Sequence, residues 1–227
     1  MLPKMIIAQN ISKKYDDTVI VKNVSLKINK GEVIAITGAS GAGKTTLLQI
    51  LGTLDVPCKD KSSQLIINNV DVLNLSEKQL AHFRNTNLGF VFQFHQLLPE
   101  FTALENVCIP GLISNTSKNE VEKKAIELLT YLGLNDKVNH FPNELSGGEQ
   151  QRVAVARALI NNPAVVFADE PSGNLDTKTA DNLHQLFFDL RDKFDQTFVI
   201  VTHNNKLAEL ADRRLIMSDG EIKKSSI

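Results

Sequence analysis

The sequence has no tryptophan, only two cysteines and no long hydrophobic run. Cys58 and Cys108 are too few for a disulfide framework and form no metal-binding pair, so we expect two free, buried thiols in a reducing compartment. No apolar stretch approaches the ~18 residues of a transmembrane helix, and we expect no membrane span. No charged segment with an apolar core opens the sequence, so we also expect no signal-peptide secretion.

A surplus of charge of one sign is absent too. The 25 basic and 26 acidic residues leave a net charge of −1, whereas proteins that grip a nucleic-acid backbone usually carry a basic surplus. We therefore expect no nucleic-acid partner. With 227 residues, of which 42% are hydrophobic and 22% charged, the composition indicates one large globular domain or one with an inserted subdomain.

Apolar strand patterns alternate with helical patterns along most of the chain. The predicted strands are 5–8, 19–28, 32–37, 64–68, 88–92, 164–168, 198–202, 215–217 and 221–222. Helices are expected from residue 44, over 178–193, and after capping boxes that begin at Ser76, Thr102, Ser117 and Ser146. Such alternation predicts a parallel sheet with right-handed crossovers, whose ligands bind beyond the carboxyl ends of the strands.

A glycine-rich segment follows the apolar segment 32–37 and precedes the predicted helix at Lys44. It reads Gly38-Ala39-Ser40-Gly41-Ala42-Gly43-Lys44-Thr45 and fits the phosphate-binding P-loop pattern. Its amides can surround phosphate oxygens, Lys44 can reach the β- and γ-phosphates, and the Thr45 hydroxyl can bind Mg²⁺. A plain glycine turn is the alternative, but the strand before and the helix after favour a P-loop.

Two carboxylates, Asp169 and Glu170, follow the apolar strand 164–168. An acidic pair at this place is often only a helix cap or a turn. Beside a P-loop, Asp169 is expected to hold Mg²⁺ through water, and Glu170 to orient and deprotonate the attacking water.

The segment Leu145-Ser146-Gly147-Gly148-Glu149-Gln150-Gln151-Arg152 opens a predicted helix. A capping box explains Ser146 and Glu149, but glycines in the first turn cost up to about 1 kcal/mol each against alanine. Their presence indicates that something approaches the backbone amides closely, and a helix start suits an anion. With the P-loop, this second anion site suggests a nucleotide held from two sides.

These motifs, in this order and spacing, resemble the nucleotide-binding subunits of ABC ATPases, and the resemblance covers the whole chain. It implies an α/β fold of the P-loop NTPase (RecA-like) type, with a mostly parallel sheet, an N-terminal antiparallel β subdomain and an inserted α-helical subdomain. The expected single ABC ATPase domain, 1–227, divides into a nucleotide-binding core (1–94 and 161–227) and a helical subdomain (95–160).

The same resemblance implies roles for individual residues. The nucleotide is bound by Tyr15, which stacks on adenine, and by Gly38, Ala39, Ser40, Gly41, Ala42, Gly43, Lys44, Thr45 and Thr46. ATP hydrolysis involves Glu170, the switch histidine His203 and the Q-loop residue Gln93, and Mg²⁺ is held by Thr45, Gln93 and Asp169. The signature residues Ser146, Gly147, Gly148 and Glu149 bind the nucleotide of the opposite subunit, and Asp176 lies in the D-loop. Taken alone, Gln93, His203 and Tyr15 would be read as polar surface or partial core.

Residues 89–107 and the segment 170–176 are similar to the group that includes the LolD, MacB and FtsE ATPases. This implies a homodimer that drives release of lipoproteins, bound peripherally through transmembrane permease subunits at the cytoplasmic face of a bacterial inner membrane. A MacB- or FtsE-like subunit that transmits force for efflux or cell division is the alternative. ABC ATPases of DNA repair or translation need extra domains, for which 227 residues leave no room.

The Q-loop region and the segment 56–64 each lead to a further expectation. The apolar residues of the Q-loop region are expected either to fill the subdomain core or to line a groove for a permease helix: Phe92, Phe94, Leu97, Leu98 and Phe101. The segment 56–64 lacks the Pro-Thr-x-Gly run common in the family, and we expect a longer polar loop away from the nucleotide.

Overall fold

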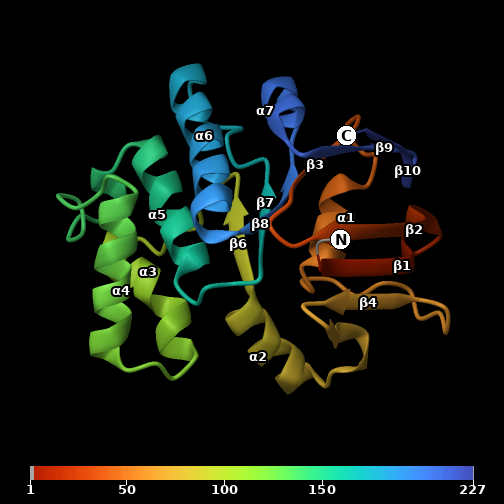
Figure 1. Cartoon of the computed structure of the whole chain (residues 1–227), viewed down its shortest axis with the longest axis horizontal. Helices are drawn as coiled ribbons and strands as arrows, with labels where there is room; N and C mark the ends of the chain where they lie inside the picture. Colours follow the sequence, from red (N-terminus) through yellow and green to blue (C-terminus); the bar gives the residue numbers. More distant parts are fainter. Residues whose placement is uncertain (1–2, 227) are drawn as a thin grey trace. The chain divides into compact units, whose positions relative to one another are not determined.

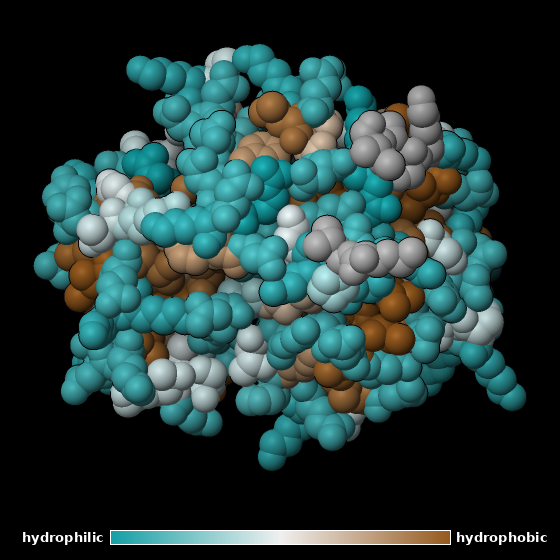
Figure 2. Space-filling model, viewed as in Figure 1, coloured by the Kyte–Doolittle hydropathy of each residue, from teal (hydrophilic) through white to brown (hydrophobic). Residues whose placement is uncertain are grey.

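The computed structural model describes residues 3–226, and side chains up to Lys223. Two compact units are formed: one runs to Ala81 and resumes at Phe188, and the other is His82–Phe187. Figure 1 labels the elements of each unit. No helix in the described part of the chain is long and apolar enough to cross a membrane. Figure 2 shows a face covered mostly by hydrophilic side chains, with separate hydrophobic areas between them.

An antiparallel sheet forms the N-terminal part of the first unit. Its strands are β1 (Lys4–Tyr15), β2 (Thr18–Asn29), β4 (Gln64–Ile67) and β5 (Val70–Asp71), in the order β2-β1-β4-β5. Asn68 and Asn69, with φ of 47° and 64°, form the predicted tight turn between β4 and β5. The expected antiparallel β subdomain is therefore confirmed.

Mostly parallel strands make up the rest of the first unit's sheet structure. Strand β3 (Val33–Thr37) lies between β8 (Thr197–Val201) and β9 (Arg213–Ser218) and is parallel to both. All five residues of β3 are buried, which explains its uninterrupted apolar sequence. β10 (Glu221–Ser226) pairs antiparallel with β9, and the helices of this part are α1 (Lys44–Leu51) and α7 (Asn205–Leu210).

The second unit combines two parallel strands with a group of helices. Strand β6 (Leu88–Phe92) pairs with β7 (Val165–Asp169). Helices α3 (Ala103–Ile113), α4 (Lys118–Tyr131) and α5 (Gly147–Leu159) pack against one another (Figure 1). Short 3₁₀ turns occupy Val72–Asn74 and Pro142–Glu144, while α2 (Glu77–Asn87) and α6 (Thr177–Phe194) each run from one unit into the other.

The predicted helix starts agree with the structure. Thr102 and Ser146 form complete capping boxes at α3 and α5, and the Ser117 hydroxyl accepts from the Glu120 amide at α4. The chain leaves α4 through Gly133, whose φ is 71°. The expected α/β architecture with a helical part is confirmed. The predicted helical subdomain, 95–160, lies inside the second unit, and its boundaries stay a prediction.

The two cysteines differ in their surroundings. Both are free, but only Cys108 is buried, whereas Cys58 is partly exposed, because it lies in the surface loop after α1. The expectation of two buried thiols is therefore wrong for Cys58. Burial raises the pKa of Cys108 to about 11, so its thiol stays protonated at neutral pH.

Candidate functional site

The glycine-rich segment forms the turn between β3 and α1 in the first unit. Gly38, Gly41 and Gly43 have φ of 151°, 78° and 94°. A side chain at Gly38 would lie 2.1 Å from the Met217 carbonyl oxygen, and one at Gly43 would lie 2.6 Å from that of Ile20. Glycine is therefore required at both positions by conformation and by close packing.

The start of α1 differs from the starts of α3, α4 and α5. Its N-cap is Gly43, and within the described residues no side chain caps it, whereas Thr102, Ser117 and Ser146 cap the other three. The Lys44 ammonium donates to the carbonyl oxygens of Gly38 and Ala39, at 2.9 Å each. Amides and an ammonium thus converge on the turn, an arrangement that suits a phosphate.

Two further predicted site residues, Tyr15 and His203, also lie in this unit. The Tyr15 hydroxyl, at the end of β1, donates to Asp55 at 2.6 Å and also hydrogen-bonds with Thr46 of α1. His203 follows β8 and is exposed. Because Ile36 pairs with Val201, His203 and Gly38 leave the sheet at the carboxyl ends of neighbouring parallel strands, as expected.

In the second unit, Gln93 and the acidic pair also lie at the ends of neighbouring strands. Phe92 pairs with Asp169, so Gln93 and Glu170 are the next residues at the same sheet edge. The Gln93 amide nitrogen donates to the Asn174 side-chain oxygen at 3.1 Å, and the Asn174 amide donates to the Gln93 carbonyl at 3.2 Å. The structure therefore brings Gln93 onto the segment that carries Asp176.

Glu170 begins a tight turn. Its φ of 47° is uncommon for a residue other than glycine and costs on the order of 1–3 kcal/mol. The Gly173 amide donates to the Glu170 carbonyl at 3.0 Å and closes the turn. Within the turn, the Ser172 hydroxyl forms a hydrogen bond of 2.9 Å with the buried His184 ring. The neighbouring residues thus hold Glu170 in a conformation that it would not adopt freely.

The segment 145–152 has a packing requirement that the sequence did not reveal. A side chain at Gly148 would lie 2.4 Å from a Thr179 methyl carbon, whereas one at Gly147 would meet only Leu175 at an ordinary 3.7 Å. Thr179 of α6 therefore leaves no room for a side chain at Gly148, whereas a side chain at Gly147 would make only an ordinary contact. Asp176 accepts from the amides of Lys178 and Thr179, and its hydrogen bonds with the side chain and the amide of Thr179 lower its pKa.

Four polar residues that sequence reasoning missed hold the Q-loop region. Arg157 of α5 donates to the carbonyls of His95 and Gln96, at 2.8 and 2.7 Å, and Gln151 donates to that of Phe92 at 3.3 Å. The His95 ring hydrogen-bonds with the Gly147 backbone. No local pattern marks these contacts, because their partners lie more than fifty residues away.

The fourth missed residue, Asn106, is completely buried in α3. Its side-chain oxygen accepts from the Leu98 amide at 2.8 Å, and its nitrogen donates to the Leu98 and Phe101 carbonyls at 3.1 and 2.9 Å. A single asparagine among the apolar residues of a helix could have indicated such a role.

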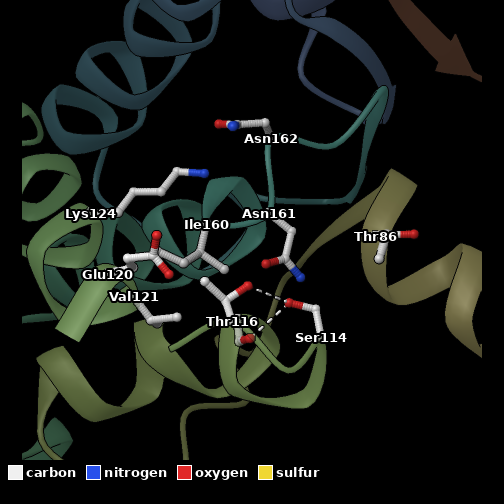
Figure 3. A pocket seen from close by; sticks show the side chains of 10 residues that line it. Thr86, Ser114, Thr116, Glu120, Val121, Lys124, Ile160, Asn161 and Asn162 are labelled. Atoms are coloured by element: carbon white, nitrogen blue, oxygen red, sulfur yellow. Dashed lines mark hydrogen bonds between the residues drawn. The ribbon is translucent and has the colours of Figure 1, made fainter. Parts of the chain in front are cut away.

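One pocket of the second unit is lined by none of the predicted site residues. It has a volume of about 380 Å³ and is lined by parts of α4 and by the ends of α2, α3 and α5. Figure 3 shows Lys124, Glu120 and Asn161 around it, and the Ser114–Thr116 hydroxyl contact at one side. Burial lowers the pKa of Lys124. The predicted chemistry does not involve this pocket.

Comparison with known proteins identifies close relatives over the full length. The model of the ABC transporter family matches residues 21–173. The lipoprotein-releasing system ATP-binding protein LolD of Bacteroides thetaiotaomicron is 58% identical over 97% of this chain and 100% of the relative. The protein of the same name from Bacteroides fragilis is 56% identical over 96% of this chain and 100% of the relative.

Solved structures of an ABC transporter cassette also match the chain over nearly its whole length. The dimeric structure of a bacterial ABC transporter cassette matches with a TM-score of 0.87 and 40% identity, covering 98% of each chain. A dimeric post-hydrolysis state of that ATP-binding cassette, bound to ADP and Pi, matches with the same TM-score, identity and coverage.

Proposed function

The chain belongs to the ABC transporter family, as an ATP-binding and ATP-hydrolysing subunit, and on this premise we propose that it drives release of lipoproteins from a bacterial inner membrane. One observation carries the proposal: the chain is 58% identical, over the whole length of the relative, to a protein named for lipoprotein release.

ATP is bound by the P-loop, with Lys44 and the amides of α1 on the phosphates and Tyr15 on the base. The exposed ring of Tyr15 and the uncapped start of α1 support this assignment. The Lys44 ammonium exchanges its bonds with the Gly38 and Ala39 carbonyls for bonds with phosphate oxygens. The ammonium is therefore hydrogen-bonded both with and without the nucleotide, so its movement costs little free energy.

Mg²⁺ would be held by the Thr45 hydroxyl, the Gln93 amide oxygen and the Asp169 carboxylate. All three are oxygen donors, the class that Mg²⁺ prefers. No group of three or more His, Cys, Asp or Glu side chains among the described residues is placed to hold a metal ion. When bound, Mg²⁺ neutralises charge that develops on the phosphates.

Glu170 accepts a proton from the attacking water, His203 contacts the γ-phosphate and Gln93 orients the water. The closed turn 170–173 supports the role of Glu170, because it fixes the backbone from which the carboxylate extends. Each chain has one P-loop and one signature segment. Ser146, Gly147, Gly148 and Glu149 therefore act on the nucleotide of a second copy, and the working unit is a homodimer.

Transmembrane permease subunits hold this dimer at the cytoplasmic face of the membrane. We define the docking patch as Phe94, Leu98 and Phe101, whose side chains are 70%, 43% and 39% exposed. Asn106 and Arg157 fix the backbone beneath the patch, so these apolar side chains are presented in a preformed arrangement. Phe92 and Leu97, the other apolar residues of this region, are half-buried.

A reconstituted system tests this function. The chain is combined in proteoliposomes with its permease and a lipoprotein, and ATP-dependent release is measured. We expect Glu170→Gln to retain ATP in a stable dimer and to lower hydrolysis at least about 100-fold, because the general base is lost. Glu209→Gln, exposed on α7, serves as the matched control.

Two results would contradict the proposal in different ways. Undiminished hydrolysis in Glu170→Gln would remove Glu170 as the base. Hydrolysis without any release of lipoprotein would favour the force-transmitting alternative of the MacB or FtsE type.

A further inference from the structure

The segment that follows α1 contacts the strand end that carries Tyr15. The Asp55 carboxylate accepts from the Tyr15 hydroxyl at 2.6 Å and from the Lys13 ammonium at 2.5 Å. Lys13 also donates to the Val56 carbonyl at 2.7 Å. All three side chains belong to the first unit, so one carboxylate connects a cation and a phenol on the same strand.

Backbone contacts fasten the same loop further along β1. The Cys58 amide donates to the Ser12 carbonyl at 2.7 Å, and the Ser63 hydroxyl donates to the Asn10 carbonyl at 2.8 Å. The loop 56–64 thus begins beside Lys13, which donates to Val56, and the expectation that the loop stays away from the nucleotide stays a prediction.

Lys13 determines which face of the Tyr15 ring is available. Its ammonium lies over the ring, 5.0 Å from the centroid, and covers one face by a cation–π contact. The Tyr15 residue is still 47% exposed. A flat base can therefore stack only on the opposite face, and the ring cannot swing away to another χ1 rotamer without breaking the hydroxyl bond.

The charge states favour this arrangement at neutral pH. Burial of Asp55 opposes its ionisation, but the bonds from Lys13 and Tyr15 outweigh burial and lower its pKa. The bond to Asp55 raises the pKa of Tyr15, which stays a protonated donor. The Asp55 carboxylate thus accepts hydrogen bonds from the Lys13 ammonium and from the Tyr15 phenol.

We propose that Asp55 and Lys13 are positioning residues, which hold the Tyr15 ring in one orientation for stacking on the base of the bound nucleotide. The inference rests on the proposed nucleotide contact of Tyr15 and extends it to a loop that departs from the family pattern. Neither residue touches the nucleotide; both act through the ring.

The test compares a ligand that has a base with one that has none. Affinities for ATP and for inorganic tripolyphosphate are measured by calorimetry with wild type, Asp55→Asn and Tyr15→Phe. We expect both variants to weaken ATP binding about three- to tenfold and to leave tripolyphosphate binding within about twofold. Asp60→Asn is the matched control, because the carboxylate of this exposed aspartate of the same loop accepts from the amide and the hydroxyl of Ser62. Unchanged ATP affinity in Asp55→Asn and Tyr15→Phe, or equal loss of both ligands, overturns the proposal.

Because the sequence has no tryptophan, tyrosine fluorescence provides a second measurement. With Tyr131→Phe, Tyr15 is the sole tyrosine and the main intrinsic fluorophore. We expect ATP to quench its emission by stacking, and Asp55→Asn in this background to reduce the quenching at saturating ATP. Equal quenching in both proteins counts against the proposal.

A third variant separates this inference from the proposed function. Tyr15→Ala removes the ring itself. If it binds ATP as wild type does, the nucleotide contact of Tyr15 is wrong. If it binds ATP weakly while Asp55→Asn and Tyr15→Phe bind normally, the contact stands and the positioning role of Asp55 is wrong.

Discussion

At the scale of single residues, Gly173 decides where the Gln93 side chain lies. A side chain at Gly173 would be 2.9 Å from the Gln93 amide nitrogen and 3.1 Å from its amide carbon. Alanine there would push the amide away and break its bond with Asn174. We expect Gly173→Ala to lower the rate of ATP hydrolysis about tenfold, since misplaced catalytic groups are costly, while ATP affinity changes little.

Two further variants make this prediction specific. Asn174→Ala removes the hydrogen bonds without adding bulk and should lower the rate in the same direction by a smaller factor. Asn182→Ala, exposed on α6, is the control for loss of an asparagine. Steady-state rates and ATP titrations decide the matter: a normal rate in both Gly173→Ala and Asn174→Ala would show that the Gln93 contact is unimportant.

The glycines also show what a sequence reveals at this scale. Gly38 and Gly43 could be predicted, because the P-loop pattern is local and each glycine serves the turn in which it lies. Gly148 and Gly173 could not be explained from sequence, because Thr179 and Gln93 approach them from distant parts of the chain. Asp55 was missed for the same reason: its partners lie some forty residues earlier.

At the scale of elements, α5 holds the loop after β6 through a titratable contact. Burial lowers the pKa of His95, although its hydrogen bond with Gly147 opposes the shift. The folded protein therefore favours neutral His95. This stabilisation is present above the unfolded pKa of about 6.5 and is lost as the pH falls through the lower pKa of the folded state.

We expect His95→Gln to show a smaller loss of unfolding free energy than wild type as the pH falls from about 7 to 5. Urea unfolding at a series of pH values measures this slope. His82→Gln, at an exposed position on α2, should retain the wild-type slope. Parallel curves for wild type and His95→Gln would mean that His95 does not contribute.

Element boundaries were predictable where local signals are strong. The capping residues Thr102, Ser117 and Ser146 set the starts of three helices, and uniform burial explains the apolar β3. The pattern predicted only residues 5–8 of β1, which extends over Lys4–Tyr15. Pairing with β2 continues through polar residues there, with several irregularities in register. Tertiary pairing thus overrides the local pattern.

At the scale of the whole molecule, the residues proposed to bind and hydrolyse ATP differ in kind from those proposed to contact the permease. The proposed phosphate-binding and hydrolytic groups lie in short motifs, so the sequence identifies the family. The docking patch consists of ordinary apolar residues, and its exposure depends on how Asn106 and Arg157 shape the backbone. Sequence reasoning therefore left open whether these residues fill the core, and the structure places Phe94, Leu98 and Phe101 at the surface.

Charge in the docking patch should separate permease binding from nucleotide binding. Replacing an exposed anchor in an apolar interface typically costs about 2–4 kcal/mol, or roughly 30- to 1000-fold in affinity. We expect Phe94→Asp and Leu98→Asp to lose co-purification with the permease while binding ATP within about twofold of wild type. Ile113→Asp is the matched control, because Ile113 is 64% exposed but lies at the opposite end of α3. If Phe94→Asp and Leu98→Asp still co-purify at the wild-type level, the patch is not the permease contact. If Ile113→Asp also loses the permease, the contact extends along the whole of α3.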